Sequence, residues 1–216
     1  MASNSTEFWD QRHDLTPSTE VGGDGGDSYR LVLLVDITDP GVLFECERIT
    51  DTLDEFECLD AVSSDAHHIT IKLFDVETDQ STDDLVDPSP AIRRVDRAVS
   101  EVTSVYDPFS VDLTQFNLFP DVVYGEVAGG GQLAGLNREI CDQAGVTALK
   151  RDRDEFIPHL TFGHFIGDDD YDSLVKYIEA GRELQVPTIR VEAVTLVAYE
   201  VGGRPPTYNQ LETYEL

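Results

Sequence analysis

Two short segments of the chain repeat one pattern of residue types: His, apolar, Thr, apolar. The first is HITI, residues 68–71, and the second is HLTF, residues 159–162, which begins 91 residues further along. In an extended strand, residues i and i+2 point to the same face. Each segment therefore presents one His and one Thr together, with its apolar residues on the opposite face. If the two strands face one cleft, four polar side chains converge there.

The two motif histidines, His68 and His159, are suited to acid–base chemistry at neutral pH, because an unperturbed imidazole has a pKa of about 6.5. One imidazole can take a proton from an attacking water or hydroxyl while the other gives a proton to a leaving oxygen. The hydroxyls of Thr70 and Thr161 can donate hydrogen bonds to the non-bridging oxygens of a phosphate. The four side chains together predict in-line displacement at phosphorus without a metal ion.

This pair of motifs resembles the two-histidine phosphoesterase superfamily, in particular its 2'-5' RNA ligase-like, cyclic phosphodiesterase branch. The surroundings of the motifs are similar to that family as well, and the resemblance covers about residues 29–216. The segments that carry it are YRLVLLVDIT (29–38), AHHITIKLF (66–74), IPHLTFGHF (157–165), RVEAVTLVAYE (190–200) and YNQLETYEL (208–216).

The resemblance implies a two-lobed α+β fold in which each lobe brings one motif to a central cleft. It implies an enzyme that hydrolyses the 2',3'-cyclic phosphate end of RNA or of a nucleotide to a 2'-phosphate, with reversible 2'-5' joining of RNA ends as a related activity. Carried over by position, His68 and His159 are the acid–base pair, and Thr70 and Thr161 hold the phosphate. Lys72 matches a family position and shares the expected face of His68, which predicts a further contact with the substrate anion. No cofactor is implied.

His164 departs from the family pattern, because many relatives carry Arg five residues after the second motif His. Strict alternation along the strand predicts that His164 faces away from His159, which argues against a phosphate contact. His67 is expected to be structural for the same reason of alternation. The sequence does not indicate which of His68 and His159 is the base.

Two other functions are consistent with parts of the sequence. Four histidines near the motifs suggest a metal site, but neighbouring strand residues such as His67 and His68 point to opposite faces and cannot easily bind one ion, and the same objection applies to His164. A non-catalytic RNA- or nucleotide-binding module on the same fold is the second alternative. The paired His and Thr favour the enzyme, because binding alone does not need two titratable groups.

A run of three glycines, residues 129–131, precedes a helical pattern and could surround a phosphate at the start of the helix. The run lacks the Lys and Ser or Thr of a P-loop. We therefore expect a turn and a helix start at this position.

The balance of charges is the strongest global feature of the chain. Asp and Glu number 43 against 15 Lys and Arg, which gives a formal net charge of −28. The acidic residues recur in nearly every segment, so the charge belongs to the whole surface. Such a surface repels itself at low ionic strength and is screened in concentrated salt. We infer adaptation to a halophilic cytoplasm, and we expect RNA ends to bind in a local cleft and not on a broad basic surface.

The organisation along the chain indicates one domain over residues 28–216, preceded by a flexible, Gly-rich leader over residues 1–27 in which Phe8 and Trp9 could dock. No apolar run is long enough for a membrane span. The first residues lack the apolar core of a secretory signal. We expect a cytoplasmic monomer with three reduced, buried cysteines, Cys46, Cys58 and Cys141.

The spacing of apolar residues predicts the elements that position the motifs. We expect strands over 29–38, 66–76, 108–120, 121–129, 157–167, 186–203 and 208–216, and helices over 39–59, within 82–106, and over 129–146 and 168–185. Short β-rich connections favour antiparallel pairing. The expected architecture is therefore α+β and bilobal, with two mainly antiparallel sheets, flanking helices, a central cleft and a pseudo-two-fold relation.

Overall fold

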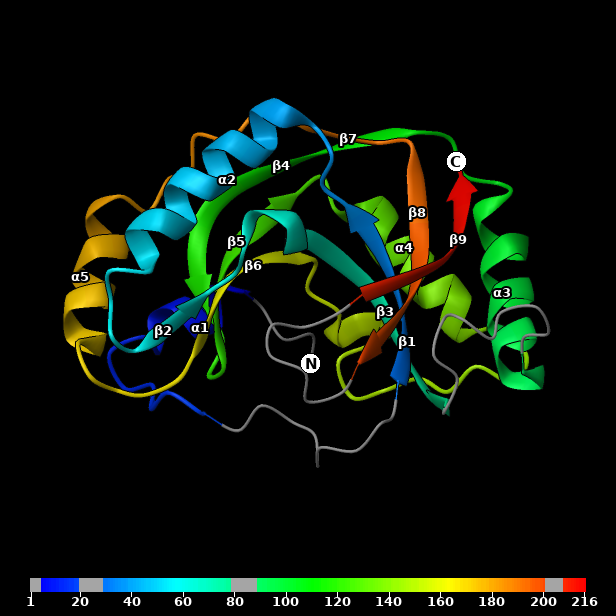
Figure 1. Cartoon of the computed structure of the whole chain (residues 1–216), viewed down its shortest axis with the longest axis horizontal. Helices are drawn as coiled ribbons and strands as arrows, with labels where there is room; N and C mark the ends of the chain where they lie inside the picture. Colours follow the sequence, from blue (N-terminus) through cyan, green and yellow to red (C-terminus); the bar gives the residue numbers. More distant parts are fainter. Residues whose placement is uncertain (1–4, 20–28, 79–88, 201–207) are drawn as a thin grey trace.

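The computed structural model describes residues 5–19, 29–78, 89–200 and 208–216. Its strands form one curled sheet in the order β7-β4-β5-β6-β3-β1-β8-β9, with β2 pairing beside β6 (Figure 1). The strands are β1 (Tyr29–Asp36), β2 (Leu59–Ala61), β3 (His68–Thr78), β4 (Phe109–Leu118), β5 (Val122–Ala128), β6 (His159–Phe165), β7 (Ile189–Val191), β8 (Ala193–Glu200) and β9 (Tyr208–Glu215). The helices are α1 (Ser5–Asp10), α2 (Pro40–Leu53), α3 (Pro90–Thr103), α4 (Gly131–Cys141) and α5 (Tyr171–Ala180), with short 3₁₀ turns η1 (Ser64–Ala66) and η3 (Arg153–Glu155).

The expected α+β class is confirmed, and the pairings among the described strands are all antiparallel. The two expected sheets are joined into one, however, through β3 and β6. These strands meet at a single registered pair, Ile69 and Leu160. The strands β5, β4 and β7 follow on one side of this junction, and β1, β8 and β9 follow on the other. Each half of the sheet therefore carries one motif.

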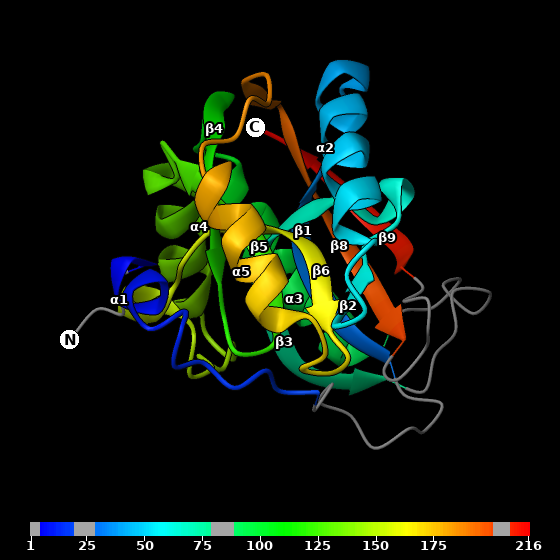
Figure 2. The ribbon, with the colours of Figure 1, turned by 90° about the vertical axis from the view of Figure 1, so that its left-hand side faces the viewer.

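The helices α2, α3, α4 and α5 bury their apolar sides in one continuous core against one face of the sheet. Figure 2 shows α5 and α2 in front of the strands of one half, and Figure 1 shows α3 at the other end of the molecule. Strand residues such as Leu33 and Ile69 are fully buried in the same core. Each such side chain contributes about 1.5–3 kcal/mol through burial.

Local sequence explains where two of these helices begin. Asp39 caps α2 by accepting hydrogen bonds from the backbone N–H groups of Gly41 and Val42 at 2.8 and 3.1 Å, and Pro40 occupies the first turn. Ser89 and Pro90 play the same parts for α3. The expected start of the first helix at Asp39-Pro40 is confirmed, but α2 ends at Leu53 and not at residue 59.

The other face of the sheet carries two smaller apolar clusters, one on each half. The cluster on the β1 half consists of Val32, Leu34 and Val197 with Leu73, Tyr199 and Tyr208 beside them. The cluster on the β5 half consists of Phe119, Val122 and Tyr124 with Phe8 and Ile157 beside them. The motif strands β3 and β6 run between the two clusters, so the motif side chains lie in the middle of this face.

Residues 5–19 correct part of the expected flexible leader, because they pack against the domain. The helix α1 places Phe8 edge-on against Phe119, with ring centroids 4.9 Å apart. The backbone N–H of Ser18 donates to the carbonyl of Pro120 at 2.7 Å. The expected boundary near residue 28 lies outside the described residues.

Two further expectations are settled by the fold. The strand expected over 186–203 is two strands, because β7 pairs with β4 while β8 pairs with β1 and β9. The three cysteines are free and buried, as expected. Within the described ranges, no helix has both the length and the apolar composition to cross a membrane.

Candidate active site

The two motifs lie side by side where β3 meets β6. Ile69 stands opposite Leu160 in an antiparallel pair, and both side chains are fully buried on the helix-covered face. Continuing this register by one residue in each direction sets His68 opposite Thr161 and His159 opposite Thr70. Because successive strand residues alternate between faces, all four polar side chains share the face without the core helices. The structure thus brings the two halves of the expected site together.

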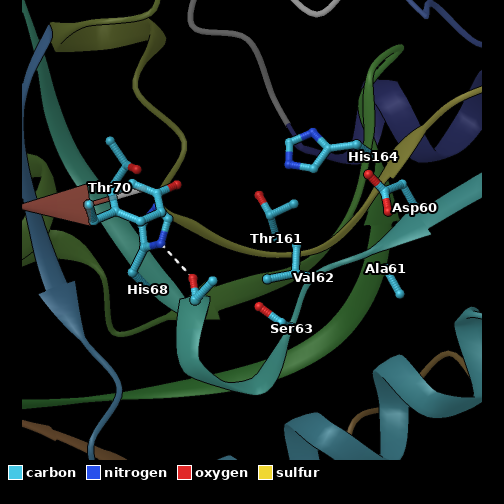
Figure 3. A pocket seen from close by; sticks show the side chains of 10 residues that line it. Asp60, Ala61, Val62, Ser63, His68, Thr70, Thr161 and His164 are labelled. Carbon is cyan, nitrogen blue, oxygen red and sulfur yellow. Dashed lines mark hydrogen bonds between the residues drawn. The ribbon is translucent and has the colours of Figure 1, made fainter. Parts of the chain in front are cut away.

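A pocket of about 490 Å³ opens on this face. Figure 3 shows His68 and Thr70 on one wall, with Thr161 near the middle and His164 and Asp60 on the other side. The residues that line the pocket are Asp60, Ala61, Val62, Ser63, Ala66, His68, Thr70, Thr161, His164 and Tyr208. His159 is not among them, so the pocket opens on the His68 side of the motif pair.

Each motif histidine is held by the backbone carbonyl two residues before it. The Nδ1 atom of His68 lies 2.8 Å from the carbonyl oxygen of Ala66, and the Nδ1 atom of His159 lies 2.8 Å from that of Ile157. A carbonyl oxygen only accepts hydrogen bonds, so Nδ1 carries the proton in both rings. The free lone pair is then on Nε2, which makes Nε2 the atom that exchanges protons with a substrate.

Close packing positions the segment that enters the second motif. A Cβ atom on Gly130 would lie only 2.7 Å from Cγ of Pro158, so glycine is needed where the start of α4 meets this proline. Gly129 adopts a positive φ of 75°, which favours glycine. The glycine run is therefore a turn and helix start, as expected, and it supports the residue that precedes His159.

Different side chains surround the two imidazoles. The ring of His159 makes edge-on contacts with Phe119 and Tyr124 at centroid distances of 5.1 and 5.2 Å. The guanidinium of Arg151 lies 5.2 Å from the centre of the Phe119 ring. His68 instead contacts the ring of Tyr208 at 5.0 Å. The two motifs are thus alike, but the side chains that surround the two histidines differ.

Burial lowers the pKa of both motif histidines below the ordinary value, because a charged imidazole loses hydration there. The carbonyl contacts oppose this shift in both rings. The nearby charges differ, since the Asp36 carboxylate raises the pKa of His68, whereas His68 and Arg151 lower the pKa of His159. Smaller opposing effects come from His164 on His68 and from Asp121 on His159. The charges around His68 therefore favour the protonated form of its ring more than the charges around His159 do.

Comparison with protein-family models shows which family the chain belongs to. The model of the 2'-5' RNA ligase superfamily matches residues 45–203, which is most of the chain. The chain belongs to the 2'-5' RNA ligase superfamily.

Known proteins are also similar to this chain in sequence or in fold. A curated protein of Methanothermobacter thermautotrophicus, named RNA 2',3'-cyclic phosphodiesterase, is 27% identical over 194 residues, which cover 87% of this chain and 98% of that protein. A crystal structure from Thermus thermophilus has a TM-score of 0.61 at 17% identity and covers 87% of this chain and 97% of its own. The structure of E. coli LigT in complex with 3'-AMP has a TM-score of 0.57 at 16% identity, with 88% and 98% covered.

Lys72, expected to bind the substrate anion, is not brought to the pocket in this superfamily member. The pairing of β1 with β3 is irregular between Leu33 and Leu34, whose partners are Lys72 and Thr70. This bulge interrupts the alternation, so Ile71 and Lys72 are both buried on the core side. The Lys72 ammonium is fully buried and pairs with Asp152 at 2.5 Å. The expected contact with phosphate is wrong for this reason.

A second bulge, in β6, brings His164 to the pocket, whereas the bulge in β3 takes Lys72 away from it. The register of β5 with β6 shifts between Val123, opposite Gly163, and Tyr124, opposite Thr161. The shift reverses the alternation after Thr161, and His164 is exposed and lines the pocket. The expectation that it faces away was wrong.

Several residues of the site were not found by sequence reasoning. Tyr208 lines the pocket from β9, which lies far from the motifs in sequence. Asp60 on β2 and Ser63 just after β2 also line it, and they come shortly before the first motif without any pattern to mark them. Arg151 had no motif to mark it. His67 is buried, with its ring 6.3 Å from that of Phe162, which agrees with its expected structural role. Within the described residues, no group of three or more His, Cys, Asp or Glu is arranged to hold a metal ion.

Proposed function

We propose that this chain is a phosphodiesterase that opens the 2',3'-cyclic phosphate ends of RNA or of nucleotides to 2'-phosphates, with His68 and His159 as the acid and base and without a metal ion. The observation that carries this proposal is the antiparallel meeting of the two motifs around Ile69 and Leu160. Two imidazoles and two hydroxyls on one face are the groups that in-line displacement at phosphorus needs. Membership of the superfamily and the name of the curated relative support the same reaction.

The pocket supports an assignment of the two roles. It is concave and offers the ring of Tyr208 beside His68, which suits the base and ribose of a terminal nucleoside. The leaving 3'-oxygen of that ribose then lies near His68. In-line displacement requires the attacking water on the opposite side of phosphorus, where His159 stands.

The reaction then proceeds with both histidines using Nε2. Water gives a proton to His159 as its oxygen bonds to phosphorus. The bond from phosphorus to the 3'-oxygen breaks, and that oxygen takes a proton from His68. Thr70 and Thr161 donate hydrogen bonds to the non-bridging oxygens. Asp36, which favours a protonated His68, agrees with the role of His68 as the acid.

The test is turnover of 2',3'-cyclic nucleotides and of RNA with a cyclic end, in the presence of EDTA, by the wild type and two variants. His68→Ala and His159→Ala should each reduce the rate by about 10²- to 10⁴-fold, the usual contribution of one general acid or base. His13→Ala is the matched control, because His13 is a surface histidine with 59% of its side chain exposed.

Three outcomes would count against the proposal. Loss of wild-type turnover in EDTA would indicate a metal-dependent reaction. Binding of these substrates without turnover would favour a non-catalytic RNA- or nucleotide-binding module. Full activity of either variant would remove that histidine from the reaction.

A further inference from the structure

The His159 side of the site carries one exposed arginine, Arg151, that hydrolysis does not require. A water molecule attacking from this side needs a base but no positive charge beside it. Yet the Arg151 guanidinium lies over the ring of Phe119, which also contacts the ring of His159, and 64% of the Arg151 side chain is exposed. Its ion pair with Asp121 is long, at 3.8 Å, and the Asp121 side chain is itself 42% exposed. Such a pair is weak, so the guanidinium is available to another anion.

Buried contacts hold the chain next to Arg151 in place. The neighbouring Asp152 accepts hydrogen bonds from Lys72, from Asn137 at 2.9 Å and from the backbone N–H of Leu149. Asn137 also donates to the carbonyl of Ile71, at the bulge of the strand that carries His68, at 2.8 Å. The Arg151 backbone is thereby tied to the first motif strand, and Phe119 lies under its guanidinium. The cation is preorganised at this position.

The strongly negative charge of the chain makes an exposed arginine near the site significant for RNA binding. The net charge of −28 repels a polyanion over most of the surface. A strand of RNA can approach only where local cations offset that repulsion, and a guanidinium binds phosphate through two parallel hydrogen bonds. The side from which a nucleophile enters is therefore also a side on which RNA phosphate can be held.

We propose that Arg151 is the acceptor-binding residue for the joining reaction that the superfamily is named after. Its guanidinium binds a backbone phosphate of the second RNA strand, whose 5'-hydroxyl replaces water as the nucleophile on the His159 side. This inference rests on the proposed function and adds a subsite for an acceptor strand. The 5'-hydroxyl gives its proton to Nε2 of His159 as the 5'-oxygen bonds to phosphorus. The bond from phosphorus to the 3'-oxygen breaks, and this oxygen takes a proton from His68. The products are a 2'-5' phosphodiester and a free 3'-hydroxyl, so atoms and charge balance without a co-reactant.

The experiment measures joining and hydrolysis in the same mixture of an RNA with a 2',3'-cyclic phosphate end and a 5'-hydroxyl acceptor. The acceptors are a short oligonucleotide, which has backbone phosphates, and a nucleoside, which has none. The wild type should prefer the oligonucleotide. Arg151→Glu should lower the ratio of joining to hydrolysis by about tenfold or more, the value of one charge-assisted contact, and should abolish the preference. Arg151→Lys should retain most of the preference for the oligonucleotide acceptor.

Arg48→Ala is the matched control, because the Arg48 side chain is equally exposed, at 64%. Arg48 is on α2, which packs on the face of the sheet opposite the motif side chains. The Arg48→Ala variant should leave both rates unchanged. Rates are compared at the pH optimum of each variant, since Arg151 also affects the pKa of His159. Equal loss of joining and hydrolysis in Arg151→Glu, or a wild type that hydrolyses but never joins, would overturn the acceptor subsite. Absence of hydrolysis in the wild type would instead overturn the proposed function.

Discussion

His68 and His159 make the same backbone contact but lie among different charges. Each ring donates from Nδ1 to a carbonyl at 2.8 Å, so neither tautomer nor geometry separates acid from base. The separation comes from Asp36, which stands opposite His68 in the register of β1 and β3, and from Arg151 beside His159. Two alike groups acquire different roles when their surroundings shift their pKa values apart.

The Asp36→Asn variant tests this separation through the pH profile of kcat/KM. The carboxylate stabilises the charged imidazole and so raises the pKa of His68, against the larger lowering by burial. Removing the negative charge should lower that pKa further. If His68 is the acid, the alkaline limb of the bell-shaped profile moves to lower pH while the acidic limb stays. Asp75→Asn, an exposed change on β3, the strand of His68, is the control. Movement of the acidic limb alone would reverse the assignment.

Lys72 illustrates how the surroundings of one residue decide its role. Its ammonium is fully buried with Asp152, whose side chain is 7% exposed, so Lys72→Met leaves a buried carboxylate without its cation. We expect a loss of about 3–5 kcal/mol in the free energy of unfolding, measured with denaturant. Because Lys72 does not line the pocket, the KM of the folded variant should stay near that of the wild type. A raised KM with unchanged stability would restore Lys72 to the substrate site.

The elements show why part of the site followed from the sequence. The motifs predicted the faces of His68, Thr70, His159 and Thr161, because alternation holds within three residues of a strand. Alternation failed beyond the motif Thr residues, because each motif strand has an irregular register just after its Thr. These bulges leave no mark in the residue types, because they depend on the pairing with β1 and β5. Tyr208 and Arg151 were missed for a similar reason, as only the fold brings their elements beside the motifs.

The helix α1 is an element whose effect on the site can be measured. Phe8 contacts Phe119, which in turn contacts the ring of His159. Phe8→Ala should loosen this series of rings and lower kcat by about threefold to tenfold, because small displacements of a catalytic group are costly. The KM should change little, since Phe8 does not line the pocket.

The same variant should also move the acidic limb of the pH profile upward. Burial is the largest cause of the lowered pKa of His159, and water admitted beside Phe119 would weaken it. Phe44→Ala, at a site 58% exposed on α2, is the matched control. A Phe8→Ala enzyme with wild-type kcat and an unchanged profile would show that α1 does not position His159.

At the scale of the whole molecule, the acidic residues belong to the surface. In the described ranges no Asp or Glu belongs to the extensive apolar core under the sheet, and Asp152, with a side chain 7% exposed, is paired with Lys72 beside it. A net charge of −28 on such a surface opposes the compact state through self-repulsion. The core explains why the chain folds, and the charge sets the conditions under which the fold is stable.

We therefore expect the melting temperature to rise by about 10 °C or more between 0.1 and 2 M KCl, where a chain of this size gains about 2–4 °C per kcal/mol. The Debye length falls from about 10 Å at 0.1 M to about 3 Å at 1 M, so repulsion between neighbouring carboxylates is screened. Sucrose at matched osmolality is the control, because it stabilises by exclusion from the surface and leaves the charges unscreened. A melting temperature that rises equally in sucrose, or that does not change with KCl, would remove the inference of adaptation to high salt.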